Sequence, residues 1–294
     1  MILEKLYKDN IIHPPKWLLN SCHYLTIMGS EAYGVSSGSS DIDVYGFCVP
    51  PRHMVFPHEA GEIFGFGDQI QRFEQFQQHQ CVDKSSRKEY DFAIYNIVKY
   101  FQLCMENNPN MTDSLWTPRR CILHITQMGE HVRANRKLFL HKGSFNKFRG
   151  YANSQLAKIQ NKTNSSNPKR AADIEANGFD TKFAYHLVRL CNECEQILTN
   201  HELDLERDRE QLKSIRRGEW TYERIVEWYT EKEKALEVIH AKSTLQDKPD
   251  QEVIKRLLLE CLEMAYGSID KAYKADQNIS KLVSELETLI GKYR

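Results

Sequence analysis

The chain has 294 residues, with 40 Lys and Arg against 40 Asp and Glu, so its formal net charge is zero. Its content of 41% hydrophobic and 27% charged residues is ordinary for a globular protein and excludes a disordered, collagen-like or low-complexity chain. No apolar run approaches the roughly 18 residues of a membrane-spanning helix. At roughly 150 residues per domain, the length predicts two domains.

The first part of the chain predicts a mixed α/β unit, because short β-branched and aromatic stretches alternate with glycine, proline and polar turns. The expected strands cover residues 23–28, 42–49, 70–76 and 88–92. The last two are separated by a polar turn at 83–86 and are expected to be neighbours in the sheet. Apolar residues at helical spacing then predict a helix over 93–105, which ends at the turn-forming residues 107–110.

Everything after Thr112 is predicted to be helical. The polar residues 163–168 are expected to form a loop, and Asp180 precedes an amphipathic helix with Phe183 and Leu187 on its apolar face. Further helices are expected over 205–217, 221–243, 250–266 and 268–291. The layout predicts an N-terminal α/β unit over 1–120 and a helical unit over 121–294.

The eight cysteines are scattered, and Met1–Pro15 carries charge and proline where a secretory signal would need an apolar stretch. Both features predict reduced thiols in a cytoplasmic protein. Cys191 and Cys194 could begin a zinc site, but a structural zinc needs a second pair of ligands nearby. Their position on the apolar face of a helix favours a place in the core.

The segment 131–172 concentrates positive charge within this neutral chain and contains no Asp or Glu. Its basic residues are Arg133, Arg136, Lys137, Lys142, Lys147, Arg149, Lys158, Lys162, Lys169 and Arg170. Such a run indicates a polyanionic partner such as RNA, and the interleaved Phe139, Phe145 and Tyr151 favour that interpretation. A solvated linker and helix surface is the alternative.

The most informative stretch runs from Met28 to Gly46. A strand ends in Gly29-Ser30, where backbone N–H groups can bind phosphate. After a small-residue loop, Asp41 and Asp43 lie two apart on the next strand, so both carboxylates project from one face. Two hard oxygen ligands beside a phosphate site suit Mg²⁺, and a third carboxylate would complete a two-metal site.

Gly-Ser, a spacer and Asp-X-Asp together resemble the signature of the DNA polymerase beta-type nucleotidyltransferase superfamily. The details Gly-Ser-X-Ala-Tyr-Gly and Ser-Asp-X-Asp-X-X-Gly are similar to the predicted nucleotidyltransferase family associated with RNA repair, called RlaP or YcgL-like. The motifs at 13–17, 107–109 and 113–116 fit that family too, so the resemblance covers roughly residues 13–120. It implies an α+β fold, in which a polymerase-beta-like catalytic domain with a small mixed sheet and helices precedes an all-α domain that closes the cleft.

The resemblance also implies roles for individual residues. Gly29 and Ser30, together with Ser40, would bind the nucleoside triphosphate, and Asp41 and Asp43 would bind two Mg²⁺ ions. The superfamily places a third carboxylate on a later strand, and Asp91 is the preferred candidate because it is expected to end a strand before a helix. Asp83 and Glu74 are its rivals. Should Asp91 serve only as the N-terminal cap of that helix, the site would lack its third ligand.

Lys182, His186 and Arg189 share one face of the amphipathic helix, because they lie at positions i, i+4 and i+7. They could contact the triphosphate or the phosphates of an acceptor, or they could form a solvated charged face. Asp113 and Trp116 also occupy family-like positions, where packing and helix initiation are the expected roles.

These features predict a Mg²⁺-dependent nucleotidyltransferase that transfers a nucleoside monophosphate from a nucleoside triphosphate to an acceptor hydroxyl. Asp41 and Asp43 would hold the metals, and Asp91 would help deprotonate or position the hydroxyl. The basic segment makes RNA the expected acceptor, as an end to be repaired or extended. One alternative is a small-molecule enzyme of the antibiotic-modifying kind, which would not need the basic segment. Another is a non-catalytic member of the fold that binds RNA or a protein.

Overall fold

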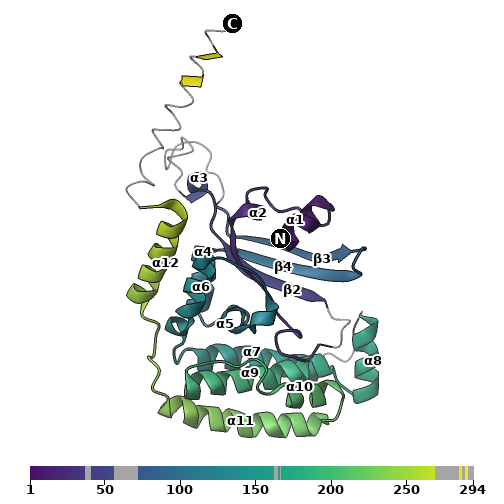
Figure 1. Ribbon diagram of the computed structural model, residues 1–294. Coiled ribbons are helices and arrows are strands. Elements are labelled where there is room, and N and C mark those ends of the chain that lie inside the picture. Colours follow the sequence, from purple (N-terminus) through teal and green to yellow (C-terminus); the bar gives the residue numbers. More distant parts are fainter. Residues whose placement is uncertain are drawn as a thin grey trace, which may run out of the picture.

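A mixed β-sheet with helices on both faces, followed by a largely helical part, forms the fold (Figure 1). The computed structural model describes residues 1–36, 41–55, 72–161, 165, 167–268, 285–286 and 289–290. Within these residues the expected α+β class is confirmed. No helix among them is long and apolar enough to cross a membrane.

The sheet has five strands in the order β3-β4-β2-β1-β5. The strands are β1 (Cys22–Ile27), β2 (Ile42–Cys48), β3 (Gln75–Asp83), β4 (Lys88–Asn96) and β5 (Ile122–Ile125). Neighbours β2 and β4 run parallel, and the other pairs run antiparallel. The expected pairing of the third and fourth strands is confirmed, and the parallel register places Asp43 beside Asp91.

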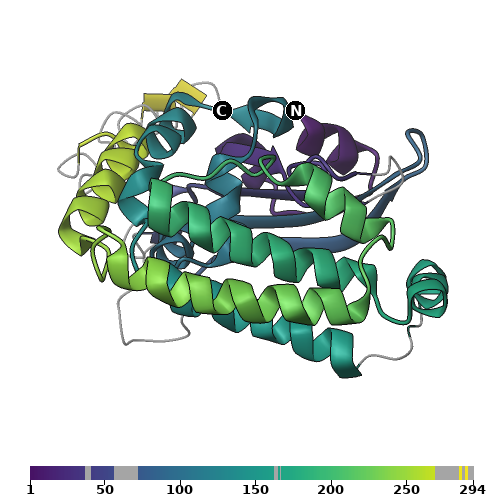
Figure 2. The same ribbon diagram turned by 90° about the horizontal axis from the view of Figure 1, so that it is seen from below.

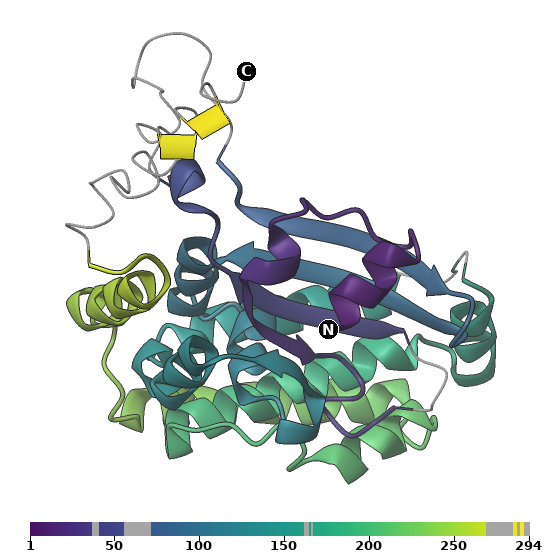
Figure 3. The same ribbon diagram turned by 45° about the horizontal axis from the view of Figure 1, so that its top comes forward.

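The two faces of the sheet bury different side chains because alternate residues of a strand point to opposite sides. Val44 and Phe92 pack under α1 (Ile2–Lys8) and α2 (Leu18–Ser21), which cover one face in Figure 3. Phe47 and Tyr95 belong to the core shared with the helical part. Asp43 and Asp91 are in phase with Phe47 and Tyr95, so both carboxylates lie on the side of the sheet that faces the helical part.

The helical part forms a layer beneath the sheet, with α7, α9 and α11 side by side (Figure 2). Its long central helix α9 begins at Asp180, whose side chain accepts a hydrogen bond from the N–H of Lys182 at 2.9 Å, and α9 is buried along most of its length. The helices after β2 are α3 (Arg52–Val55), α4 (Ile97–Met105), α5 (Pro109–Trp116), α6 (Gln127–Ala134), α7 (Ser144–Asn161), α8 (Pro168–Asn177), α9 (Thr181–Asn200), α10 (Arg209–Arg216), α11 (Tyr222–Lys242) and α12 (Gln251–Tyr266).

Three expectations about the elements need correction. The chain after Thr112 is not entirely helical, because β5 adds an edge strand to β1 two residues beyond the expected boundary at residue 120. The helix expected over 93–105 begins only at Ile97, because β4 continues through Asn96 and that side chain caps the helix. The third strand begins at Gln75 and continues to Asp83. Most of the helix expected over 268–291 lies outside the described residues.

The last glycine of the motif, Gly46, lies where β1 and β2 approach each other closely. A Cβ on Gly46 would lie 1.9 Å from the carbonyl oxygen of Tyr24, inside the space that the neighbouring strand occupies. The strand that carries Asp43 therefore requires a glycine here in order to pair with β1.

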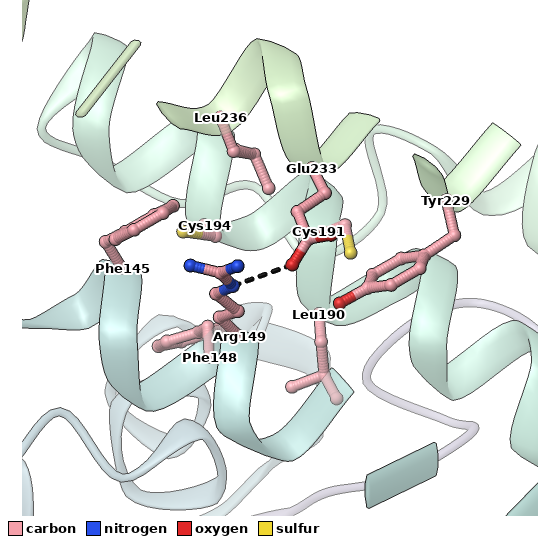
Figure 4. Close-up of a pocket in the computed structure, with 9 residues that line it drawn as sticks. All are labelled: Phe145, Phe148, Arg149, Leu190, Cys191, Cys194, Tyr229, Glu233 and Leu236. Carbon is pink, nitrogen blue, oxygen red and sulfur yellow. Dashed lines mark hydrogen bonds and ion pairs between the residues drawn. The ribbon is translucent and has the colours of Figure 1, made fainter. Parts of the chain in front are cut away.

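Cys191 and Cys194 lie in the core, as expected. Figure 4 shows both thiols between α7, α9 and α11, beside the ion pair of Arg149 with Glu233. Burial raises the pKa of the Cys194 thiol to about 12, so this group stays protonated. The described residues contain no cluster of His, Cys, Asp and Glu that would make a zinc site with them.

Candidate active site

The loop after β1 places backbone N–H groups beside the acidic residues. Gly29 has a φ of +66°, which only glycine adopts without strain, and a Cβ there would lie 2.4 Å from Oδ2 of Asp43. The N–H of Tyr33 donates to the carbonyl of Gly29, and the N–H of Val35 donates to that of Ser30. In the described part of the chain, the N–H groups of Gly29 and Ser30 donate to no acceptor, so both remain available to a ligand.

Three carboxylates share the helix-facing side of the sheet at the end where β2 begins. Asp41 is exposed just before β2, and Asp43 is half-buried within it. The parallel register pairs Asp43 with Asp91, so their side chains point to the same face. The register therefore brings Asp91 beside Asp43, and the charge of Asp41 also reaches Asp43.

Asp91 lies in the interior of β4, not at its end as expected. Asn96 caps the following helix instead, where its side chain accepts from the N–H of Lys99 at 2.8 Å. The alternative that Asp91 is a helix cap is therefore wrong. Its Oδ1 accepts a hydrogen bond from the N–H of Gln80 at 2.7 Å, across a bulge in β3, and this bond fixes the carboxylate.

Neither rival for the third carboxylate lies beside Asp43. Asp83 is buried at the β3–β4 turn, where it accepts hydrogen bonds from Lys5 at 2.8 Å and from the hydroxyl of Ser85 at 2.6 Å. These bonds hold the pKa of Asp83 well below its usual value. Glu74 is exposed just before the opposite end of β3.

Asp43 is the electrostatically strained member of the acidic group. Burial raises its pKa from 3.8 to about 6, and the negative charges of Asp91 and Asp41 add to the shift. The positive charge of Lys182 acts in the opposite direction. A carboxylate with an elevated pKa among other acids is a feature of functional sites, where a bound cation or substrate offsets the repulsion.

The chemistry of these three residues fits Mg²⁺, which prefers carboxylate oxygens and completes its shell with water and phosphate oxygens. The repulsion at Asp43 is the structural observation that supports the fit, because a divalent cation would neutralise it. As the side chains stand, no three His, Cys, Asp or Glu residues in the described part of the chain are gathered closely enough to hold an ion.

Positive side chains of α8, α9 and α10 lie across from the carboxylates. We call Arg170, Lys182, His186 and Arg216 the cationic cluster. Desolvation lowers the pKa of Lys182, although the residue keeps solvent exposure, and the charge of Arg170 acts in the same direction. The charges of Asp43 and Asp41 oppose this shift, so Lys182 lies within electrostatic reach of both groups.

His186 is half-buried within the cationic cluster. Burial lowers its pKa well below the usual value, and the positive charges of Arg189, Lys182, Arg216 and Arg170 lower it further. His186 is therefore neutral at physiological pH and can donate one hydrogen bond and accept another. Among the described residues, Lys182, His186 and Arg216 form no salt bridge, whereas Arg170 pairs with Asp180 at 3.5 Å.

Arg189 lies in the interior and is not part of the cationic cluster. It is 5% exposed and forms ion pairs with Asp113 and Glu193, the latter at 2.9 Å. Lys182 and His186 therefore lie at the candidate site, whereas the third residue of the expected helix face lies behind it. The packing role expected for Asp113 and Trp116 is confirmed, because both are buried in α5. The expected role in helix initiation is wrong, because α5 begins at Pro109 and is capped by Asn108.

Many of the basic residues in the segment 131–172 pair with acidic residues from other parts of the chain. Arg133 is buried and donates to the hydroxyl of Tyr24 at 2.8 Å. Six further basic residues form ion pairs: Arg136 and Lys137 with Glu202, Lys142 with Asp247, Lys147 with Glu106, Arg149 with Glu233, and Arg170 with Asp180. Acidic residues distant in the sequence therefore offset part of the charge of this segment, and its binding to a polyanion such as RNA stays a prediction.

Sequence reasoning missed Arg216 as a site residue and counted Arg170 only as part of the basic segment. No sequence signal marked Arg216, because its proximity to His186 depends on how α10 packs beside α9. Ser40 and Lys162 lie outside the described residues, as does the side chain of Lys169.

Comparison with protein families matches residues 18–260 to RlaP, described as the RNA repair pathway DNA polymerase beta family. No curated protein matches the chain. Among solved structures, one match is a nucleotidyltransferase-like protein from Exiguobacterium sibiricum 255-15. It is 8% identical, and the alignment covers 99% of this chain and 89% of that one with a TM-score of 0.29.

Proposed function

Since this chain belongs to the RlaP family of polymerase beta-like proteins, we propose that it is a Mg²⁺-dependent nucleotidyltransferase. An acceptor hydroxyl attacks the α-phosphate of a nucleoside triphosphate, the bond to the β-phosphate breaks, and pyrophosphate leaves. The observation that supports this most strongly is the register that pairs Asp43 with Asp91, next to the glycine loop.

The acidic and cationic groups would have different roles in this reaction. Asp41, Asp43 and Asp91 would hold Mg²⁺, which when bound supplies positive charge at the reacting phosphate and acidifies the attacking hydroxyl. The N–H groups of Gly29 and Ser30 would bind phosphate oxygens. Asp91, fixed through Gln80, would orient the acceptor hydroxyl and help remove its proton.

The cationic cluster would bind the rest of the triphosphate. Lys182 and Arg216 have no acidic partner among the described residues, so their charges are available to phosphate oxygens. His186 would donate a hydrogen bond from a neutral imidazole. This arrangement would bind an anion between the sheet and α9, next to the carboxylates.

RNA is the acceptor that we propose, and the family description supports it. The basic segment supports this choice less strongly than its sequence suggested, because several of its lysines are paired with acidic residues. That pairing favours a small-molecule acceptor as the second candidate, and the same assay distinguishes the two.

The test uses the full-length chain with Mg²⁺, each α-labelled ribonucleoside triphosphate, and either a pool of short RNAs or a small hydroxylated acceptor. We expect label to move onto RNA. Asp43→Asn and Asp91→Asn should each lower the rate by about 1,000-fold or more, because a lost metal ligand removes several kcal/mol of transition-state stabilisation.

Glu74→Gln is the matched control for Asp91→Asn, since Glu74 was a rival carboxylate and lies exposed away from the site. It should retain the wild-type rate. Full activity in Asp43→Asn would contradict the proposed site. If only the small acceptor becomes labelled, the acceptor is a small molecule and not RNA. If the wild type binds RNA but transfers no label, the protein is a non-catalytic RNA-binding protein.

A further inference from the structure

The glycine loop is attached to the helical part through one tyrosine. Tyr33 is 2% exposed, and its hydroxyl donates to Oδ2 of Asp113 on α5 at 2.8 Å. The guanidinium of Arg189 on α9 lies over its ring, 4.3 Å from the centroid, and also binds Asp113. One side chain of the loop is therefore held on its face and at its tip by two buried charged residues.

This attachment continues through the backbone to the candidate metal site. The N–H of Tyr33 donates to the carbonyl of Gly29 at 3.2 Å, so the position of Tyr33 sets that of the Gly29 peptide. Gly29 in turn lies against Oδ2 of Asp43. An unbroken series of contacts therefore runs from Arg189 through Tyr33 and Gly29 to the acidic residues.

The same helix carries two residues that would bind the triphosphate, the cation Lys182 and the neutral His186. Lys182 and His186 precede Arg189 on α9 by about two turns and one turn, respectively. Movement of α9 relative to the sheet would therefore displace both the cationic cluster and, through Arg189 and Tyr33, the phosphate-binding N–H groups. The two halves of the proposed triphosphate site are fixed to each other by this contact.

A second set of contacts, separate from those of Tyr33, also holds the loop. Arg120 donates to the carbonyl of Glu31 at 3.0 Å and makes a two-bond ion pair with Glu206, which precedes α10. A Cβ on Gly34 would lie 2.9 Å from the carboxylate of Glu206. The loop is thus held from both α9 and the segment that leads into α10.

We infer that Arg189, together with Asp113 and Tyr33, positions the Gly29–Ser30 loop against the cation-bearing helix, and that this alignment sets the affinity for the nucleoside triphosphate. The inference rests on the proposed function, and it makes Arg189 a positioning residue that does not touch the substrate. The buried ion pairs themselves are consistent with this role, since such networks specify geometry more than they add stability.

The test compares Tyr33→Phe and Arg189→Lys with wild type in steady-state transfer. We expect the KM for the nucleoside triphosphate to rise about fivefold in Tyr33→Phe and about tenfold in Arg189→Lys. The KM for the acceptor and kcat should stay within about twofold, because the carboxylates are unchanged. Tyr229→Phe is the matched control, since it removes another buried hydroxyl, which donates to Asn153 at 2.6 Å away from the loop.

Hydrogen exchange of the backbone amides provides a readout that does not depend on activity. The amides of Tyr33 and Val35 should exchange about tenfold faster in Tyr33→Phe than in Tyr229→Phe, at a similar loss of melting temperature. Unchanged KM and unchanged loop exchange in both loop variants would overturn the inference. A wild-type chain without transfer would overturn the proposed function instead, and loop exchange would still decide whether Arg189 and Tyr33 fix the loop.

Discussion

Two charged regions of this protein differ in how their charge is used. The basic segment 131–172 has the densest positive charge in the sequence, yet five of its ten basic residues, none of them in the cationic cluster, are paired with acids from other parts of the chain. The cationic cluster has fewer charges, but Lys182 and Arg216 have no salt-bridge partner among the described residues. If the proposed function holds, charge that the fold leaves unpaired indicates the binding site better than charge density in the sequence does.

The acidic side of the site shows the same principle. Asp83 is surrounded by hydrogen-bond donors, so its pKa is lowered and its role is structural. Asp43 faces other carboxylates, so its pKa is raised. Proteins tolerate such repulsion where a ligand compensates for it.

The largest effect expected from this comparison concerns Lys182 and Arg216. Lys182→Ala and Arg216→Ala should each raise the KM for the nucleoside triphosphate by about 10-fold to 100-fold, because a charge-assisted hydrogen bond to phosphate contributes about 1.5–3 kcal/mol. Steady-state kinetics at fixed acceptor concentration measures this effect. A KM within about twofold of wild type in both variants would mean that the cluster does not bind the triphosphate.

A moderate change in thermal stability is expected when Asp43 is replaced by asparagine. In metal-free buffer at pH 7.5, Asp43→Asn should raise the melting temperature by about 2–4 °C, because it removes a carboxylate whose ionised form the fold disfavours by about 1–2 kcal/mol. The folded-state pKa of about 6 exceeds the ordinary aspartate value of 3.8, so the penalty is present above pH 6 and disappears as the pH falls through 6 toward 4.

Melting curves at pH 7.5 and pH 4.5 check this sign, since the difference between wild type and variant should shrink at the lower pH. Added Mg²⁺ should also reduce the difference at pH 7.5 by stabilising only the wild type. A variant that is less stable than wild type at pH 7.5 would show that Asp43 is a structural residue.

The smallest effect is expected in the basic segment. A triple variant, Lys137→Ala, Lys142→Ala and Lys147→Ala, should change the KM for nucleotide and the affinity for RNA by less than about twofold. These lysines take part in ion pairs near the surface, which contribute about 0–1 kcal/mol each. Filter binding at two salt concentrations measures the affinity. A loss of RNA affinity by tenfold or more would show that this segment is the RNA-binding surface.

The sequence by itself determined the elements that carry the site. The strands around Gly29-Ser30 and Asp41–Asp43 were predictable because strand periodicity is local: alternate residues must point to one face, whatever lies next to the strand. The core positions of Cys191 and Cys194 followed from helical periodicity in the same way. The sequence identifies Gly29 and Gly46 only as parts of the motif, and the structure shows that Asp43 and the carbonyl of Tyr24 approach them closely.

Tertiary structure alone decided which distant residues meet. The parallel pairing of β2 with β4 brings Asp91 to Asp43, and no spacing rule distinguishes Asp91 from Asp83 or Glu74. The same is true of β5, which is a strand because β1 offers it an open edge. Arg189 looked like a neighbour of Lys182 on one helix face, but the packing of α5 against α9 buries it. Burial and ion pairing are properties of the folded neighbourhood, so the sequence shows where charges occur and the fold determines which of them remain free to act.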